Sequence, residues 1–188
     1  MTTAPAIPPR VQTAACMRVV TFAASALAAF FVSVPVHAQT IQIVALGASN
    51  TAGKGVSASS AWPAQLHAML RAKGYDARVT NAGINGDDMG RMLARAANAV
   101  PSSTQIVILD KAASNDRLRG INTEANIAAI SNQLRARNIK TIVVAGMHGW
   151  AGGRLQPDGI HITEAGHAAV ASRLLPQVTA AIGSRTSR

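Results

Sequence analysis

The chain has 188 residues, of which 18 are Lys or Arg and 8 are Asp or Glu, so its formal net charge is +10. Its 48% hydrophobic content excludes a disordered chain, and its single cysteine excludes an intramolecular disulfide framework. The basic charge makes nucleic acid a candidate partner, but the arginines are scattered and not interleaved with aromatic residues. We therefore expect no nucleic-acid binding. The charge is interpreted as a solvated surface that would attract anionic polymers of a cell envelope.

Residues 1–38 have the pattern of a secretory signal. Met17-Arg18 precedes an apolar run from Val19 to Val34, and the segment ends in Val36-His37-Ala38. A basic start, a short apolar stretch and a small-x-small ending are typical of a signal that is cleaved, here after Ala38. A membrane anchor is the alternative, and it is disfavoured because the run is short for a membrane span. The start at Met1 or at Met17 stays open.

Cleavage would leave residues 39–188 as a single domain that is periplasmic or secreted and has no stable membrane anchor. Cys16 would be lost with the signal, so the mature chain would contain no cysteine. About 150 residues are enough to bury a hydrophobic core without disulfides.

Four apolar runs predict β-strands, at residues 41–46, 77–82, 105–109 and 139–145. Between them lie four helical patterns. The first is capped by Ser59 or Ser60, the second is opened by Asp87 or Asp88, the third is capped by Thr123, and the last starts at Thr163-Glu164 and is kinked or restarted at Pro176. This alternation predicts an α/β fold with three αβα layers, built on a flavodoxin-like parallel sheet of four to five strands.

Polar residues follow the end of each predicted strand. Ser49 comes after the first, Asn81–Gly86 after the second, Ser114-Asn115-Asp116 after the third and Asp158–His161 after the fourth. The carboxyl ends of parallel strands share one edge of the sheet, where α/β proteins bind their ligands. A hydroxyl, a backbone amide, a carboxamide and an Asp/His pair are therefore expected to meet there. Taken alone, each of these residues could equally be a turn or surface residue.

Together these segments resemble the SGNH family of GDSL-type esterases and lipases, and most closely its secreted arylesterase, thioesterase and lysophospholipase subgroup. The matching blocks follow in family order: Gly47-Ala48-Ser49 with Ala52-Gly53, Trp62-Pro63, Asn81-Ala82-Gly83-Ile84-Asn85-Gly86-Asp87, Ala113-Ser114-Asn115-Asp116 with Leu118-Arg119-Gly120, and Asp158-Gly159-Ile160-His161.

The resemblance implies a serine esterase that hydrolyses small aryl, short-acyl or thioesters through an acyl-enzyme, without cofactor or metal. Ser49 would be the nucleophile, His161 the general base and Asp158 the residue that orients His161. The backbone N–H groups of Ser49 and Gly86 and the side-chain amide of Asn115 would form the oxyanion hole. We expect a monomer whose partner is a small-molecule ester.

Several positions depart from the family pattern. Ala48 replaces an Asp, Asn50 replaces a Leu, Ala113 replaces a Gly, and a short segment, 146–157, replaces a long insertion. Two alternative functions follow from these departures. One is removal of O-acetyl groups from a polysaccharide, and the other is a degenerate, non-catalytic binding module.

The sequence also supports predictions for four further side chains. Lys111 lies close to the predicted oxyanion hole and is interpreted as a solvated loop lysine, with binding of an anion as the alternative. His148 is an alternative general base without an obvious Asp partner. His67 and His167 are expected to be exposed on helices.

Overall fold

The computed structural model describes residues 1–2, 39–144 and 146–186. The predicted signal of residues 1–38 lies almost entirely outside the described residues, so the division into a signal and one domain stays a prediction. In the part of the chain that is described, no helix is both long and apolar enough to span a bilayer.

Four parallel strands form one sheet, which confirms the α/β prediction. They are β1 (Ile41–Gly47), β2 (Ala77–Gly83), β3 (Ile106–Asp110) and β4 (Lys140–Val144), in the order β2-β1-β3-β4. In register, Ala45 of β1 pairs with Asn81 of β2 and with Ile108 of β3. All four carboxyl ends therefore lie at one edge of the sheet. The boundaries differ from expectation by one residue: β1, β2 and β3 end one residue later, at Gly47, Gly83 and Asp110, and β3 and β4 begin one residue later, at Ile106 and Lys140.

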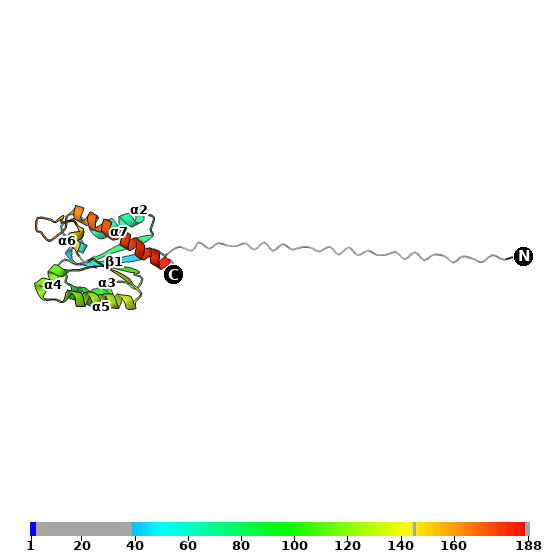
Figure 1. The fold of residues 1–188 in the computed structure, drawn as a ribbon, viewed down its shortest axis with the longest axis horizontal. Helices are drawn as coiled ribbons and strands as arrows, with labels where there is room; N and C mark the ends of the chain where they lie inside the picture. The colour runs from blue at the N-terminus through cyan, green and yellow to red at the C-terminus, as the bar shows by residue number, and fades with distance from the viewer. Residues whose placement is uncertain (3–38, 145, 187–188) are drawn as a thin grey trace. The chain divides into compact units, whose positions relative to one another are not determined.

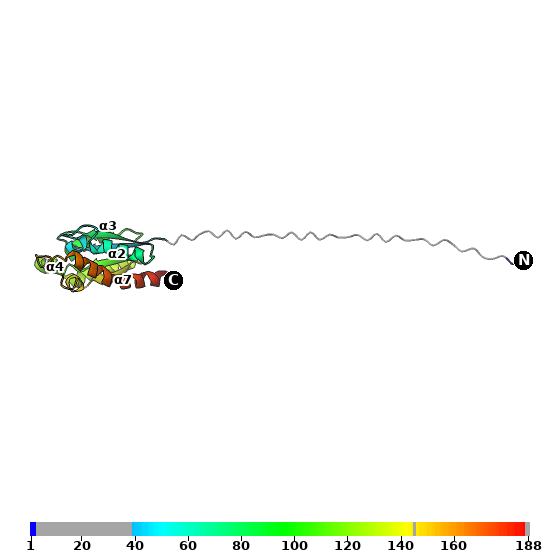
Figure 2. The same cartoon turned by 90° about the horizontal axis from the view of Figure 1, so that it is seen from above.

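Seven helices are described: α1 (Ser49–Ala52), α2 (Trp62–Ala72), α3 (Met89–Ala99), α4 (Ala113–Arg119), α5 (Thr123–Ala136), α6 (Met147–Trp150) and α7 (Glu164–Thr186). Helices α2 and α7 run side by side on one face of the sheet, and α3 and α5 pack together on the other (Figures 1 and 2). This is the predicted arrangement of three layers. Helices α4 and α6 lie in segments that the sequence suggested were irregular loops.

The core consists of two apolar clusters, one on each face of the sheet. Because neighbouring side chains of a strand point to opposite faces, Ile43 and Ala45 of β1 pack toward α2 and α7, while Val44 and Leu46 pack toward α3 and α5. All four are fully or almost fully buried. This explains why β1 is apolar along its length instead of alternating with polar residues.

The starts of two helices correct the sequence analysis. Helix α2 has Ala61 at its N-cap with no side-chain cap, and the hydroxyl of Ser60 instead donates to Glu164 at 2.6 Å. Helix α5 is capped by Asn122, which accepts the N–H of Ala125, while the hydroxyl of Thr123 donates to Asp116. In both cases the hydroxyl of the expected cap is hydrogen-bonded to a residue of another helix, α7 for Ser60 and α4 for Thr123.

Pro176 does not restart the last helix. α7 is a single helix with Pro176 inside it. Its buried face continues across that position, since Val170, Leu174 and Val178 are all fully buried. Packing on both sides offsets the backbone hydrogen bond that proline cannot donate.

His167 is buried in the core, so its expected exposure was wrong. Its Nδ1 accepts the backbone N–H of Trp62 at 3.1 Å, which joins α7 to the first turn of α2. Burial lowers the pKa of His167 to about 4, so the ring is neutral near pH 7. His67 is half-buried.

Candidate active site

The turn between β1 and α1 holds Ser49 at the carboxyl edge of the sheet, and it has no room for larger residues beside it. A Cβ atom at Gly47 would lie 2.1 Å from the Thr51 hydroxyl oxygen. A Cβ atom at Gly83, at the end of β2, would lie 2.2 Å from the backbone nitrogen of Ala52. Both glycines therefore allow the strand ends to close onto α1, which fixes the position of Ser49.

Ser49, His161 and Asp158 form a continuous chain of hydrogen bonds. His161 Nε2 lies 3.0 Å from Ser49 Oγ, and His161 Nδ1 lies 2.5 Å from Asp158 Oδ2. Asp158 Oδ1 also accepts the backbone N–H groups of Ile160 and His161, each at 2.9 Å. The hydrogen bond from the His161 ring, together with these N–H groups, holds the pKa of Asp158 well below its usual range. A permanently ionised Asp158 favours a proton on Nδ1, which leaves Nε2 free to accept a proton from Ser49.

Asn50 connects the turn at Ser49 to the loop that holds His161. Its Oδ1 accepts the N–H of Ile162 at 3.0 Å, and its Nδ2 donates to the carbonyl of Ile160 at 3.2 Å. These two bonds bracket His161. The sequence showed Asn50 only as a departure from the family pattern, and nothing in the sequence indicated a partner 110 residues away.

Asn115 lies in the same pocket as Ser49, whereas Gly86 does not line it. Asn115 Nδ2 donates to the carbonyl of Asp87 at 2.6 Å, which fixes the side-chain amide and leaves its second N–H for another acceptor. Gly86 is exposed and has φ +74°, a conformation that favours glycine, and its carbonyl accepts from Arg119 at 3.0 Å. The structure thus brings Asn115 to Ser49 and places Gly86 in the adjoining loop.

Arg95 is largely buried and does not face solvent as the sequence suggested. Its guanidinium group pairs with Asp87 at 2.8 Å and donates to the carbonyls of Gly47 and Ala82. Gly47 is the last residue of β1, and Ala82 is the next-to-last residue of β2. Arg95 therefore clamps together the two strand ends that position Ser49.

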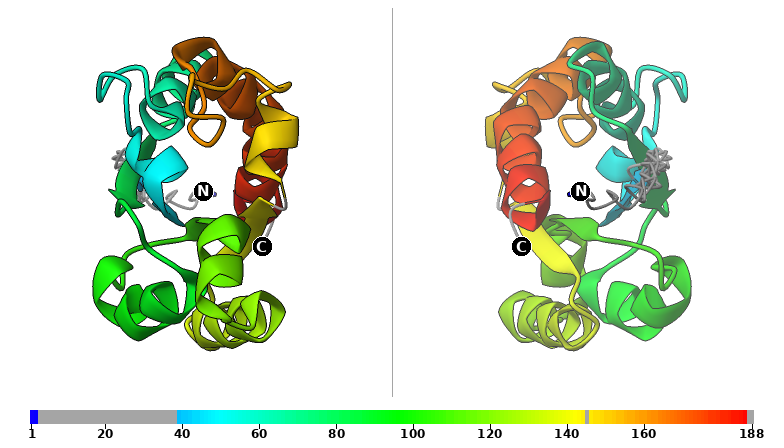
Figure 3. Two further views of the ribbon diagram at one scale, coloured as in Figure 1. Left: turned by 90° about the vertical axis from the view of Figure 1, so that its left-hand side faces the viewer. Right: turned by 90° about the vertical axis from the view of Figure 1, so that its right-hand side faces the viewer.

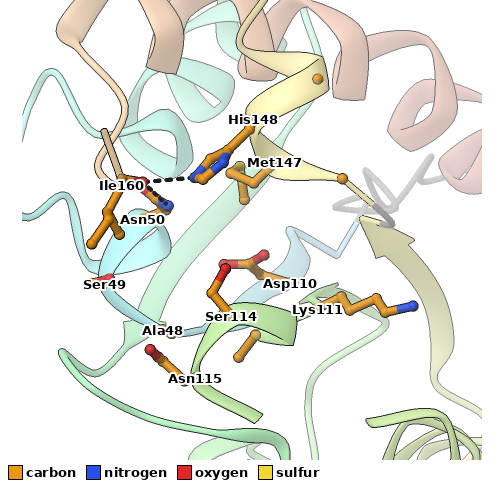
Figure 4. A pocket seen from close by; sticks show the side chains of 13 residues that line it. Ala48, Ser49, Asn50, Asp110, Lys111, Ser114, Asn115, Met147, His148 and Ile160 are labelled. Carbon is orange, nitrogen blue, oxygen red and sulfur yellow. Dashed lines mark hydrogen bonds between the residues drawn. The ribbon is translucent and has the colours of Figure 1, made fainter. Parts of the chain in front are cut away.

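A pocket of about 180 Å³ opens beside Ser49 (Figure 4). Its lining is formed by Ala48, Ser49, Asn50, Asp110, Lys111, Ala112, Ser114, Asn115, Gly146, Met147, His148, Gly149 and Ile160. It is small and partly polar, so it suits a short group better than a long alkyl chain.

Asp110 is the buried carboxyl group of this pocket, and the sequence analysis did not single it out. Its Oδ2 accepts the hydroxyl of Thr51 at 2.9 Å, and it also accepts the backbone N–H of Ala48. Burial raises the pKa of Asp110 to about 6, although these hydrogen bonds and the nearby His148 act in the opposite direction. Asp110 of β3 thus places a carboxyl group next to the Ser49 turn. In this chain Ala48 replaces the Asp that the family pattern has in the turn itself.

Lys111 and His148 have partners other than Ser49. The ammonium group of Lys111 pairs with Glu124 and points away from Ser49 (Figure 4). His148 Nε2 lies 2.7 Å from the carbonyl of Ile160, so this nitrogen carries a proton and donates it. The hydrogen bond to Ser49 belongs to His161. Among residues 39–144 and 146–186 there is also no group of three or more His, Cys, Asp or Glu residues that could hold a metal ion.

Comparison with known proteins gives a consistent result. The model of the GDSL-like Lipase/Acylhydrolase family matches residues 45–157, so Asp158 and His161 lie just beyond the match. Esterase TesA of Pseudomonas aeruginosa is 33% identical over 110 residues, which cover 57% of this chain and 54% of that protein. Thioesterase 1/protease 1/lysophospholipase L1 of Escherichia coli is 32% identical over 105 residues, which cover 54% and 49%. The chain spans about half the length of these curated relatives.

Solved structures show the same fold. The crystal structure of TesA superimposes with a TM-score of 0.68 at 24% identity, covering 74% of this chain and 99% of that chain. The psychrotrophic esterase EstA from Pseudoalteromonas sp. gives a TM-score of 0.61 at 18% identity, covering 78% and 99%.

The raised pKa of Asp110 predicts how stability changes with pH. A carboxyl group whose pKa is higher in the folded than in the unfolded state contributes stability at low pH and loses it as the pH rises through the folded value. The free energy of unfolding of the wild type, relative to Asp110→Asn, should therefore fall by roughly 3 kcal/mol between pH 3.8 and 6. Urea unfolding at several pH values measures this difference.

Thr51→Val is the matched second variant, because it removes one hydrogen bond that lowers the pKa of Asp110. In this variant the fall in stability should begin at the same pH, because the unfolded pKa is unchanged, but continue to a higher pH and so be larger in total. A difference between wild type and Asp110→Asn that does not vary with pH would contradict the prediction.

Proposed function

This chain belongs to the GDSL-like lipase/acylhydrolase family, and on that premise we propose that it is a serine esterase. Ser49 is the nucleophile, His161 the general base and Asp158 the residue that orients His161. The observation that carries the proposal is the hydrogen-bond chain from Asp158 through His161 to Ser49, at 2.5 and 3.0 Å. A serine hydroxyl is a weak nucleophile unless a neighbouring base takes its proton, and His161 Nε2 is within reach to do so.

The reaction proceeds in two steps. Ser49 Oγ attacks the acyl carbonyl while its proton passes to His161 Nε2, and the tetrahedral oxyanion collapses to an acyl-Ser49 as His161 protonates the departing alcohol or thiol. His161 then takes a proton from water as the water oxygen attacks the acyl group, and the second tetrahedral intermediate collapses to the carboxylic acid while His161 returns the proton to Ser49 Oγ. Asp158 stabilises the imidazolium ion that exists during each step.

In this proposal the oxyanion is bound by the backbone N–H of Ser49, the backbone N–H of Gly86 and the side chain of Asn115. The support is strongest for Asn115, which lines the pocket with one N–H already fixed by Asp87. Gly86 lies one residue from Asp87, so the Asn115–Asp87 bond holds the two groups near each other. Preorganised donors of this kind stabilise charge that develops only in the transition state.

The pocket supports a small substrate. A volume of about 180 Å³ with a buried carboxyl group suits short-acyl, acetyl or aryl esters and short thioesters. An O-acetyl group on a polysaccharide is the second candidate, since a small acyl pocket would accept it as well. The intact hydrogen-bond chain supports an enzyme over a non-catalytic binding module.

Replacing the nucleophile should abolish the chemistry. Ser49→Ala is expected to eliminate both turnover of a small aryl ester and labelling by a fluorophosphonate probe, and His161→Ala should be nearly as severe. The double variant should be little worse than either single variant, because the members of one catalytic unit are not additive.

Ser102→Ala is the matched control, since Ser102 is exposed in the turn before β3 at the opposite edge of the sheet. This variant should retain full labelling and turnover. A folded Ser49→Ala protein that still hydrolyses the ester would refute the assignment and favour the binding module.

Removing the Asn115 amide should lower kcat about 10²–10³-fold with little change in KM, because the lost hydrogen bond is strongest in the transition state. Steady-state kinetics of Asn115→Ala with an aryl ester measure this. Asn132→Ala, on the exposed side of α5, is the control. Turnover within a factor of two of the wild type would make Asn115 a structural residue.

We also propose that the enzyme is exported, on the basis of the apolar run and the Val36-His37-Ala38 ending. Amino-terminal sequencing of protein from the native host should then read from Gln39. Recovery of the full-length chain from the cytosol would contradict export.

A further inference from the structure

Exposed hydrophobic side chains gather at the edge of the sheet that carries Ser49. In the described part of the chain, the exposed large apolar side chains are those of Met1, Val143 and three residues near this edge. These three are Ile84 (49% exposed), Leu118 (86%) and Ile160 (52%). Ile84 directly follows β2, Leu118 lies on α4 after β3, and Ile160 lies in the loop between Asp158 and His161. A single exposed leucine is ordinary, whereas several around one opening indicate an interaction surface.

Hydrogen bonds fix Ile84 and Ile160 to the active-site turn, and the segment of Leu118 to the loop after β2. The N–H of Ile84 donates to the carbonyl of Gly47, and the carbonyl of Ile160 accepts from Asn50. Arg119, next to Leu118, donates to the carbonyl of Gly86. We call Ile84, Leu118 and Ile160 the apolar rim: all three are exposed in segments that follow the carboxyl ends of the strands, and Ile160 also lines the Ser49 pocket. Its segments, with α1, α4 and the loop before α7, face the viewer in the left view of Figure 3.

The charges beside the apolar rim are mainly positive. Lys54, Arg117 and Arg119 are exposed in the segments that carry the rim or adjoin it. Three acidic residues nearby are buried: Asp87 pairs with Arg95, Asp88 caps α3 and pairs with Arg119, and Asp116 accepts from Met89 and Thr123. Asp158 is exposed, but its carboxylate is bound to His161. Apolar side chains flanked by basic ones match a surface that presents anions above a hydrocarbon layer.

We propose that the apolar rim docks this protein onto the surface of an anionic phospholipid bilayer. Ile84, Leu118 and Ile160 enter the boundary between headgroups and acyl chains, while Lys54 and Arg117 lie at the phosphates. Delivery of an ester from the docked state to Ser49 rests on the proposed function, whereas docking itself does not. An acidic polysaccharide would attract the basic residues equally, but it would gain nothing from the three apolar side chains.

The first test asks which face of the protein meets the bilayer. An environment-sensitive fluorophore is attached to the full chain through Leu118→Cys, Ile160→Cys or, as the control on β4, Val143→Cys, each with Cys16→Ser so that one site is labelled. The vesicles contain ether-linked phosphatidylglycerol and phosphatidylcholine, because ether lipids cannot be hydrolysed by an esterase. Labels at 118 and 160 should shift to shorter wavelengths and the label at 143 should not.

The second test separates apolar from electrostatic contributions. Leu118→Ser should weaken vesicle binding roughly tenfold, whereas Val143→Ser should leave it unchanged. Lys54→Ser combined with Arg117→Ser should weaken binding, unlike Arg135→Ser in the last turn of α5, and 1 M salt should weaken binding of the wild type.

Three outcomes would overturn the proposal. Contact made only through residues 1–38 would leave all three labels unshifted, and nonspecific adsorption would shift the label at 143 as much as the others. Binding lost in salt but unaffected by Leu118→Ser would indicate a soluble polyanion as the partner. Failed docking in a protein that still hydrolyses an aryl ester would remove this inference alone, and normal docking in a protein without esterase activity would remove only the proposed function.

Discussion

The site depends on the close approach of backbone and side chains at the carboxyl end of β1. Gly47 and Gly83 leave no space for a Cβ atom, so the ends of β1 and β2 pack directly against α1. Thr51 of α1 and Asp110 of β3 occupy the space next to Gly47, and Arg95 binds the carbonyls of Gly47 and Ala82 near the ends of both strands. This packing fixes the position of Ser49. Asn50, the next residue, ties the loop of His161 to it by a hydrogen bond.

The acidic residues are concentrated where they organise this edge of the sheet. Asp87, Asp88, Asp110 and Asp116 are all buried, and each accepts hydrogen bonds that fix a strand end or a helix start. Most of the basic side chains, by contrast, are exposed. The positive charges behind the net charge of +10 therefore lie mainly on the surface, whereas these four carboxylates lie inside the fold.

The sequence was sufficient for the four strands, the shared edge of their carboxyl ends and the pairing of Asp158 with His161, because these depend on local patterns. It did not reveal the roles of Asn50, Arg95 or Asp110, or the burial of His167. Each of these residues has at least one partner that is 48 to 112 residues away in the chain. Residue type and spacing do not reveal such distant partners. A family pattern can reveal them, but this chain departs from the pattern at Ala48 and Asn50.

The tight packing around the two glycines also has a consequence for protein engineering. A library that varies positions 47 or 83 would mostly sample misfolded proteins, because any side chain there meets backbone or buried atoms. The pocket wall formed by His148, Gly149 and Ile160 is built from segments that are more accessible to solvent and belong to no strand. The fold thus separates a part that tolerates almost no variation from a part where substrate range could evolve without loss of the nucleophile.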